Sequence, residues 1–185
     1  MVHENTQLNE VLEFWFGELS EKDWFTKSDE VDKKIVERFS ELHKEVVAGE
    51  YWKYRTSGKS LLAEIIVLDQ FSRNMFREDA RAFAQDSLAL ALSQQAIANG
   101  FDVGMTIDER MFLYLPFMHS ESKVIHTAAV PFFESLGVES TLKYEHIHKD
   151  IIDRFGRYPH RNEILGREST DEEKEYLAST TENFF

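Results

Sequence analysis

The sequence predicts an all-α protein in which seven to eight helices pack as an antiparallel helical array or an irregular bundle. Apolar residues recur at helical spacing along most of the chain, so each segment has one face to bury. Most glycines stand where these apolar stripes end, and the chain contains only three prolines. No linker or low-complexity segment interrupts this pattern, which indicates a single all-helical domain over residues 1–185. No clean internal repeat is present, so the residues alone do not predict a regular solenoid.

The composition excludes several classes of function. The formal net charge is −13, whereas binding to nucleic acid or to an anionic membrane surface needs clustered Lys and Arg. The absence of cysteine excludes disulfides, thiolate metal sites and cysteine nucleophiles. No apolar run is long enough to span a membrane, and the first residues lack the pattern of a secretory signal. We therefore expect a soluble, cytoplasmic protein.

Two helices are expected at the N-terminal end of the chain. The first covers roughly residues 8–16, with Gly17 as its C-cap. The second begins near Ser28, a residue type that caps helix N-termini, and it ends at Gly49. Both segments carry apolar residues at the i, i+3, i+4 spacing, so each should pack one face into the core.

The third expected helix, residues 61–77, carries a carboxylate on its apolar face. Leu62 and Ile65 belong to that face, and Asp69 falls in its middle when residues are placed about 100° apart. A carboxylate that faces a core is costly unless it is paired and hydrogen-bonded. Arg73, one turn later at i+4, is the nearest candidate partner.

Three further helices are expected in the middle of the chain. The fourth should span about residues 79–99, and the fifth about residues 108–115, where Pro116 stops it. The sixth should run from Ser120 toward residue 136, and Pro131 should kink it or split it.

The last two helices have clear end signals. The seventh should cover about residues 140–155, with Gly156 directly after it. The last should begin at Thr170, because Thr170 and Glu173 have the spacing of a capping box. Gly137 ends the sixth helix in the same way as Gly156 ends the seventh.

Residues 154–167 (RFGRYPHRNEILGR) are rich in arginine, and their glycines and proline indicate a loop. One interpretation is an anion site built on Arg157, His160 and Arg161, because arginines fork onto carboxylate or phosphate groups. The other is internal ion pairing with carboxylates of the same chain: Asp69, Asp150 and Glu121. In both interpretations we expect this stretch to meet the Asp69 helix inside the fold.

Residues 116–121 (PFMHSE) place His119 and Glu121 next to an expected helix start. A histidine and a carboxylate can perform general acid–base catalysis, which makes both of them catalytic candidates together with Asp69 and His160. Ser120 could be a nucleophile, but no nucleophile-elbow pattern surrounds it, so an N-cap is the simpler role.

A metal site is not expected from the spacing of the possible ligands, which are His119, Glu121, His146, His148 and His160. No HExxH-type motif is present, and two histidines two residues apart on a helix point in different directions. We therefore predict no metal and no cofactor.

Three long motifs, LDQFSRNMFR (68–77), LYLPFMHSE (113–121) and RFGRYPHRNEILGRES (154–169), follow an opening VLEFWFGE (11–18). Together they resemble the bacterial family called domain of unknown function 924, over nearly the whole chain. That family is similar to tetratricopeptide-like helical folds, so the resemblance implies an all-α helical array and carries no established activity. The family commonly has proline where this chain has Ser72, which implies a helix that bends or ends near Phe71.

Three hypotheses follow for the function. The first is a polar pocket that binds a small anionic ligand, with acid–base catalysis as an extension. Its expected ligand-binding residues are Asp69, Arg73, Asn74, Arg77, His119, Glu121, Arg157, His160, Arg161 and Asn162. The alternatives are a tetratricopeptide-like module that binds an acidic peptide in an arginine-rich groove, and a buried ion-pair network that only holds the fold together. Whether the chain is an enzyme stays open, as does a homodimer built on its aromatic residues.

Overall fold

The computed structural model describes residues 5–180, and every regular element in that range is helical, as the apolar spacing predicts. The α-helices are α1 (Thr6–Glu13), α2 (Glu21–Phe25), α3 (Asp29–Val47), α4 (Gly58–Ile65), α5 (Ser72–Met75), α6 (Asp86–Ala98), α7 (Ile107–Met118), α8 (Lys123–Leu136), α9 (Glu139–Phe155) and α10 (Asp171–Ser179). Two π-helical turns, η1 (Phe14–Glu18) and η3 (Ile66–Phe71), extend α1 and α4. Short 3₁₀ turns occur at η2 (Trp52–Tyr54), η4 (Ala80–Ala82) and η5 (Pro159–Arg161).

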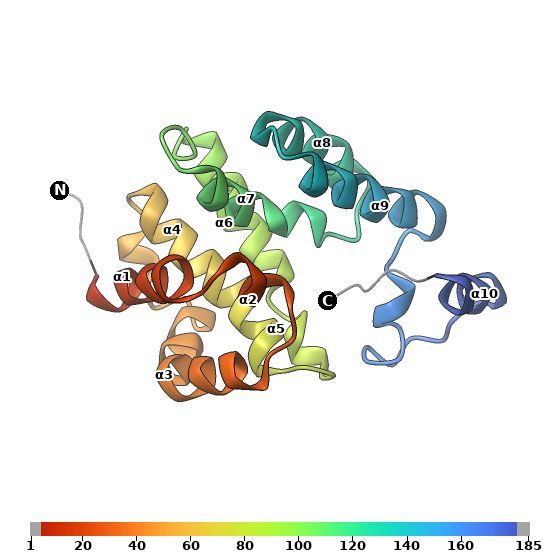
Figure 1. Cartoon of the computed structure of the whole chain (residues 1–185), viewed down its shortest axis with the longest axis horizontal. Helices are drawn as coiled ribbons and strands as arrows, with labels where there is room; N and C mark the ends of the chain where they lie inside the picture. The colour runs from red at the N-terminus through yellow and green to blue at the C-terminus, as the bar shows by residue number, and fades with distance from the viewer. Residues whose placement is uncertain (1–4, 181–185) are drawn as a thin grey trace.

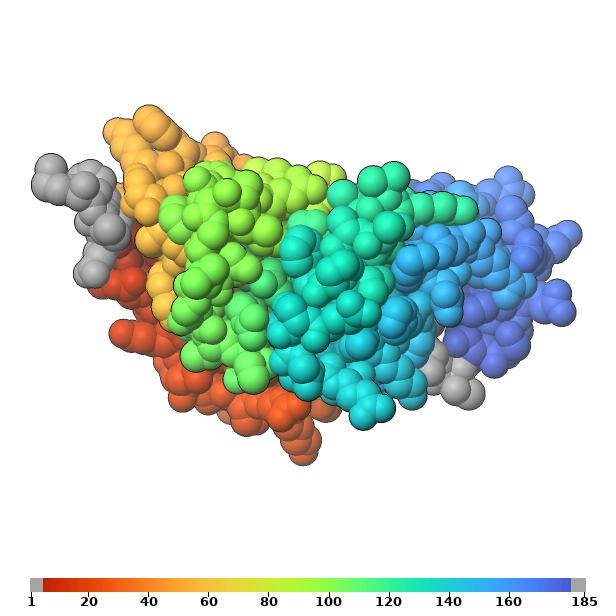
Figure 2. Space-filling model, turned by 90° about the horizontal axis from the view of Figure 1, so that it is seen from above, coloured from red at the N-terminus to blue at the C-terminus, as the bar shows by residue number. Residues whose placement is uncertain are grey.

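Along the long axis of the molecule, helices α1–α7 form one end, and α8, α9 and α10 follow in that order toward the other end (Figure 1). Contacts join α1 to α4, α4 to α6, α6 to α7, α7 to α8 and α8 to α9. The surface follows the same order, because its colours pass from orange through green and teal to blue along that axis (Figure 2). The architecture is therefore compatible with a helical array. Among residues 5–180, no helix has both the length and the apolar character needed to cross a membrane.

Several helix ends lie where the local sequence places them. The Ser28 side chain accepts a hydrogen bond from the Val31 N–H at the start of α3, and Thr170 forms a capping box at the start of α10. Gly137 and Gly156 terminate α8 and α9 in the left-handed conformation, with φ of +69° and +71°. These helix ends are confirmed, because capping depends on neighbours within a few residues.

Other boundaries correct the prediction. Residues 61–77 are not one α-helix: α4 passes into the π-helical turn η3 and then into α5, and the backbone stays right-handed helical through Phe71 and Ser72, so the helical path does not end there as the resemblance implies. Gly17 is not a C-cap, since it lies within η1. Residues 79–99 also form two elements, because the 3₁₀ turn η4 precedes α6, which begins only at Asp86.

Both helix-interior prolines are accommodated, which corrects two further expectations. Helix α7 continues past Pro116 to Met118, and α8 runs unbroken through Pro131. Helix α8 begins at Lys123, after Ser120, so Ser120 is not its N-cap. Every residue from Met111 to Met118 is buried, and this packing outweighs the single hydrogen bond that Pro116 cannot donate.

The core holds the π-helical turn η3 in place through Phe71. Its ring lies 4.9 Å from that of Phe39 and 5.7 Å from that of Trp15, measured between centroids. A smaller apolar cluster lies under the C-terminal third, where Ile152 and Tyr158 are fully buried.

Replacing Pro131 tests how much this residue lowers the stability of the folded chain. Pro131 is exposed and lies in the helix interior, so Pro131→Ala restores a backbone donor without disturbing the core. We expect the free energy of unfolding to rise by about 1–3 kcal/mol, since proline is roughly 3 kcal/mol less favourable than alanine inside a helix. Urea unfolding measures the change, with the exposed Thr127→Ala as a control that should stay within about 0.5 kcal/mol. An unchanged Pro131→Ala variant would show that α8 is not strained at this position.

Candidate functional site

The carboxylate of Asp69 lies at the centre of the polar region and has no exposure to solvent. Its Oδ1 lies 3.0 Å from Arg73 Nη1 and 2.7 Å from His119 Nδ1, while its Oδ2 accepts a hydrogen bond of 2.6 Å from Gln70. The predicted i+4 pair of Asp69 and Arg73 is therefore confirmed. Burial alone would raise the pKa of Asp69, but Arg73 and His119 outweigh it and hold that pKa below its ordinary value.

His119 caps the C-terminus of α7 and is kept neutral by its surroundings. Burial lowers its pKa, and the charge of Arg73 adds to this effect, so the opposing influence of Asp69 is outweighed. A neutral imidazole that meets a carboxylate carries its proton on the meeting nitrogen, so Nδ1–H donates to Asp69 and Nε2 keeps a lone pair. This is the arrangement of a general base held in one tautomer by an acidic residue.

Asp86, in the first turn of α6, joins the two stretches that the sequence expects to meet. It accepts hydrogen bonds of 2.9 and 3.0 Å from Arg73 and one of 3.0 Å from Nη1 of Arg161. Stretches 61–77 and 154–167 therefore meet through Asp86, which lies outside both of them, and not through Asp69. Sequence reasoning missed Asp86 because it expected a continuous helix there, in which position 86 has no special role.

Arg161 is buried between two aromatic rings, with 6% of its surface exposed. Its guanidinium carbon lies 4.5 Å from the centroid of Phe83 and 4.6 Å from that of Tyr158. Only Nη1 is hydrogen-bonded, and Nε is buried without a partner among the described residues. The Nε–Nη2 edge, which is the edge that forks onto a carboxylate or phosphate, is therefore unused within residues 5–180.

Two adjoining cavities share Phe83, His119 and Arg161 as a common wall. The larger, here called the arginine pocket, has a volume of about 390 Å³. It is lined by Lys27, Arg73, Arg77, Glu78, Ala82, His148, His160, Ile164, Leu177 and Thr180 in addition to the shared wall.

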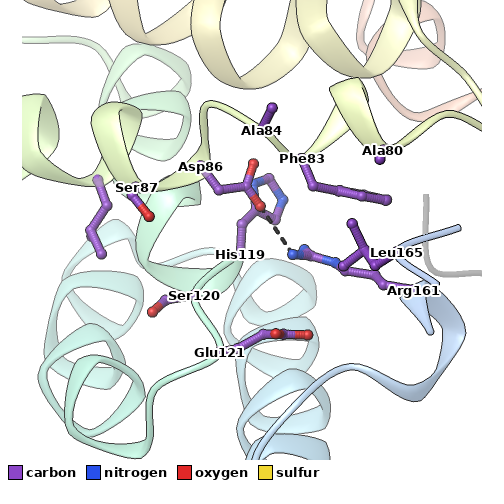
Figure 3. Close-up of a pocket in the computed structure, with 11 residues that line it drawn as sticks. Ala80, Phe83, Ala84, Asp86, Ser87, His119, Ser120, Glu121, Arg161 and Leu165 are labelled. Carbon is purple, nitrogen blue, oxygen red and sulfur yellow. Dashed lines mark hydrogen bonds and ion pairs between the residues drawn. The ribbon is translucent and has the colours of Figure 1, made fainter. Parts of the chain in front are cut away.

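The smaller cavity, here called the serine pocket, has a volume of about 250 Å³ and includes Ser87, Ser120, Asp86 and Glu121 in its lining. Figure 3 shows it with the ion pair of Asp86 and Arg161 beside the His119 ring. A ligand at the shared wall would therefore touch both His119 and Arg161.

Two more histidines of the arginine pocket are also uncharged at neutral pH. Burial lowers the pKa of His148 to about 4 and that of His160 to about 3, and in His160 the nearby charge of Arg161 acts in the same direction. His148 Nδ1 lies 2.8 Å from the carbonyl oxygen of Tyr144 and donates to it. The histidines thus add hydrogen-bonding surface to the pocket but no positive charge.

Some expected ligand-binding residues are engaged in ion pairs of the fold. Arg157 pairs with Glu173, which also accepts from Asn162. Glu121 pairs with Arg167 through contacts of 2.6 and 2.9 Å, as the ion-pair interpretation expects, although it also lines the serine pocket.

Two further expected residues, Asn74 and Arg77, form hydrogen bonds with Asp32 of α3. Arg77 nevertheless lines the arginine pocket. Of the ten expected residues, the five that line this pocket are Arg73, Arg77, His119, His160 and Arg161.

A buried cluster that the sequence did not single out ties the two sides of the site together. The Tyr158 hydroxyl donates to the carbonyl of Met118 and lies 3.0 Å from His126 Nε2, which lies 2.9 Å from the carbonyl of Ser120. His126 Nδ1 in turn lies 2.7 Å from a carboxylate oxygen of Glu145. Since Tyr158 immediately precedes η5 and Met118 immediately precedes His119, the cluster fixes Arg161 relative to His119.

Within residues 5–180, no group of three or more His, Asp or Glu side chains is arranged to hold a metal ion.

Comparisons with known proteins find similarity along nearly the whole chain. The profile of a family described as bacterial protein of unknown function, DUF924, matches residues 11–181. The solved structure of the protein of unknown function ATU0120 from Agrobacterium tumefaciens is 36% identical, with a TM-score of 0.89. The similarity covers 94% of this chain and 97% of that one. No curated protein matches the chain.

Removing the charge of Asp69 tests its structural role. Asp69→Asn keeps the shape of the side chain but leaves Arg73 with one carboxylate in place of two. We expect a loss of about 3 kcal/mol in the free energy of unfolding, since breaking a buried pair leaves a charge uncompensated. Asp153→Asn, which breaks a surface pair with Lys149, should cost less than about 1 kcal/mol. Equal effects in urea unfolding would contradict the central role of Asp69.

The neutral histidines predict a loss of stability in mild acid. The pKa of His148 is about 4 in the folded chain, against an ordinary value of about 6.5, so only the unfolded chain binds a proton between these values. Stability therefore falls as the pH drops below about 6.5. Between pH 7.5 and 5.0, His148 alone should account for about 2 kcal/mol of the loss.

Unfolding of His148→Gln at both pH values measures this contribution. The variant should lose less stability on acidification than the wild type does, by the amount that His148 supplies. His146→Gln, on the exposed side of α9, is the matched control and should follow the wild type. Parallel behaviour of all three proteins would refute the assignment.

Proposed function

The chain belongs to the DUF924 family of bacterial proteins, and we propose that it binds a small anionic molecule against the shared wall of its two pockets, where His119 exchanges a proton with that molecule. The observation that carries the proposal is the unused Nε–Nη2 edge of the buried Arg161. A buried polar group without a partner costs stability, so an anion that fills this edge gains more than it would at a solvated arginine.

The position of His119 supports the proton transfer. The imidazole lies on the wall that both pockets share with Arg161, so a ligand held by the arginine lies beside it. Its Nδ1–H bond to Asp69 sets the tautomer and would stabilise the imidazolium that forms when Nε2 takes up a proton. The two groups have separate roles: Arg161 binds and orients, and His119 acts as base and then as acid.

The low exposure of the arginines favours a small molecule over a peptide. The tetratricopeptide-like groove of the second hypothesis needs cationic side chains that reach out to an acidic chain. Arg161 has 7% and Arg73 13% of its side-chain surface exposed, so neither extends into solvent. Relationship to the tetratricopeptide-like superfamily remains part of the proposal, supported by the sequential packing of the helices.

The ion-pair hypothesis accounts for part of the polar residues but not for all of them. Arg157 and Arg167 are paired with carboxylates and support the fold, as that hypothesis expects. Arg161 differs, because its Nη1 is paired with Asp86 whereas its buried Nε has no partner among residues 5–180, and the residue lines both cavities. A network that served stability alone would gain from an apolar residue at this position.

Thermal unfolding against a panel of anionic metabolites tests the proposed function. A ligand at about 100 times its dissociation constant adds roughly 2.7 kcal/mol of stability. For a domain of this size we expect Tm to rise by several degrees, at about 2–4 °C per kcal/mol. The rise should vanish in Arg161→Met and persist in Arg157→Met, whose arginine is paired with Glu173.

A second measurement isolates the role of His119. Titration calorimetry near pH 6 in two buffers of different ionisation enthalpy counts the protons taken up when the anion binds. The wild type should take up a fraction of a proton, and His119→Gln should bind without doing so. A Tm rise that survives Arg161→Met, or proton uptake that survives His119→Gln, would contradict the assigned roles.

A further inference from the structure

Resting on the proposed function, we infer that the ligand is a monocarboxylate with a compact apolar body: its carboxylate forks onto Arg161 and its body lies in the arginine pocket. Three features of the pocket lead to this class. They are the shape of the unused edge, the balance of charge around it and the apolar part of its lining.

The unused edge of Arg161 is suited to a planar, two-oxygen group. Nε–H and Nη2–H are parallel donors, and they match the two oxygens of a carboxylate. The stacking of the guanidinium between Phe83 and Tyr158 prevents it from turning toward a different geometry. Nη1 is held by Asp86, which fixes the remaining rotation. The edge therefore offers one bidentate contact in one direction.

The charges that surround the pocket are already balanced. The cationic side chains of its lining are Lys27, Arg73, Arg77 and Arg161. Each is within ion-pair distance of a carboxylate, and these carboxylates are Glu78, Asp69, Asp86 and Asp32.

Because the three histidines of the pocket are kept neutral by burial, an entering anion adds uncompensated negative charge. Glu121, on the serine-pocket side of the wall, has its own partner in Arg167 and contributes no excess positive charge.

This balance separates a carboxylate from a phosphate. A phosphate monoester carries a charge of about −1.5 to −2 at pH 7, whereas a carboxylate carries one. The cost of placing charge in a poorly solvated cavity rises steeply with its magnitude. One bidentate contact to Arg161 can offset one negative charge more readily than it can offset two negative charges. A monoanion should therefore be preferred.

The remaining lining indicates what else the ligand carries. Ala82, Phe83, Ile164 and Leu177 border the arginine pocket and expose apolar surface to it. The volume of about 390 Å³ lies in the range of sites for small molecules and leaves room for a ring or a short aliphatic chain. An anion without an apolar body would leave this surface in contact with water, so it would not gain the free energy of burying apolar surface.

Four matched probes test the inference by titration calorimetry at pH 7.5: benzoate, phenyl phosphate, benzamide and acetate. Benzamide removes the charge of benzoate, acetate removes its ring, and phenyl phosphate adds a second charge. We expect benzoate to bind at least tenfold more tightly than each of the others. Arg161→Lys, which keeps the charge and loses the fork, should weaken benzoate at least tenfold, and Arg157→Lys should leave it unchanged.

A measurement on the wild-type protein replaces the variant if Arg161→Lys does not fold. The second pKa of a phosphate monoester is about 6, so phenyl phosphate becomes largely a monoanion at pH 5.5. Its affinity relative to benzoate should therefore improve at least threefold between pH 7.5 and 5.5. The ratio to benzoate cancels changes in the protein that affect both anions equally, and repeating the comparison in His119→Gln removes the proton that this side chain takes up at low pH.

The outcomes separate this inference from the proposed function. Phenyl phosphate that binds as tightly as benzoate at pH 7.5, or a ratio that does not change with pH, overturns the monocarboxylate class and leaves an anion site standing. Acetate equal to benzoate overturns the apolar body. Benzamide equal to benzoate overturns both the class and the anion site. If no probe binds up to millimolar concentration, the monocarboxylate class is overturned. Thermal unfolding with the metabolite panel then decides separately whether the anion site exists.

Discussion

Asp69 is a carboxylate without access to water, and the arrangement of the site depends on how it is satisfied. Its oxygens form an ion pair with Arg73 and accept from His119 and Gln70, so one buried charge orients two side chains that face a cavity. Arg73 then needs a second carboxylate, which Asp86 supplies, and Asp86 in turn holds Arg161. The chain of contacts runs from the core to the pocket wall, because no member can be left uncompensated in a poorly solvated interior.

The same constraint sets the charge of the side chains that line the pocket. Burial keeps the histidines neutral, so the pocket offers hydrogen bonds and a lone pair where a solvated cluster would offer positive charge. The π-helical turn η3 carries both Asp69 and the core residue Phe71, so the acid is held by packing as well as by its ion pairs. Turns of this kind recur at functional sites. Tyr158 adds rigidity by linking η5 to the end of α7.

Much of the helical order was accessible from the sequence. Apolar spacing located most of the helices, and capping residues such as Ser28 and Thr170 located several of their ends, because these signals act between residues a few positions apart. The prolines were less informative. Pro116 and Pro131 disfavour a helix locally, but the buried faces of α7 and α8 outweigh that preference. Propensity is a weak guide wherever tertiary packing supplies the larger free energy.

The sequence by itself determined that a carboxylate at position 69 had to be buried and paired, and that Arg73 was within reach on the same helix. It also indicated His119 and Arg161 as unusual polar residues in an acidic chain. Only the tertiary structure decided that Asp86 joins them, that Arg157 pairs with Glu173 away from the cavity, and that one edge of Arg161 has no partner in the part of the chain that the structure describes. The reason is physical: neighbours within one helix are set by its 3.6-residue turn, whereas partners from distant segments are selected by how whole helices pack.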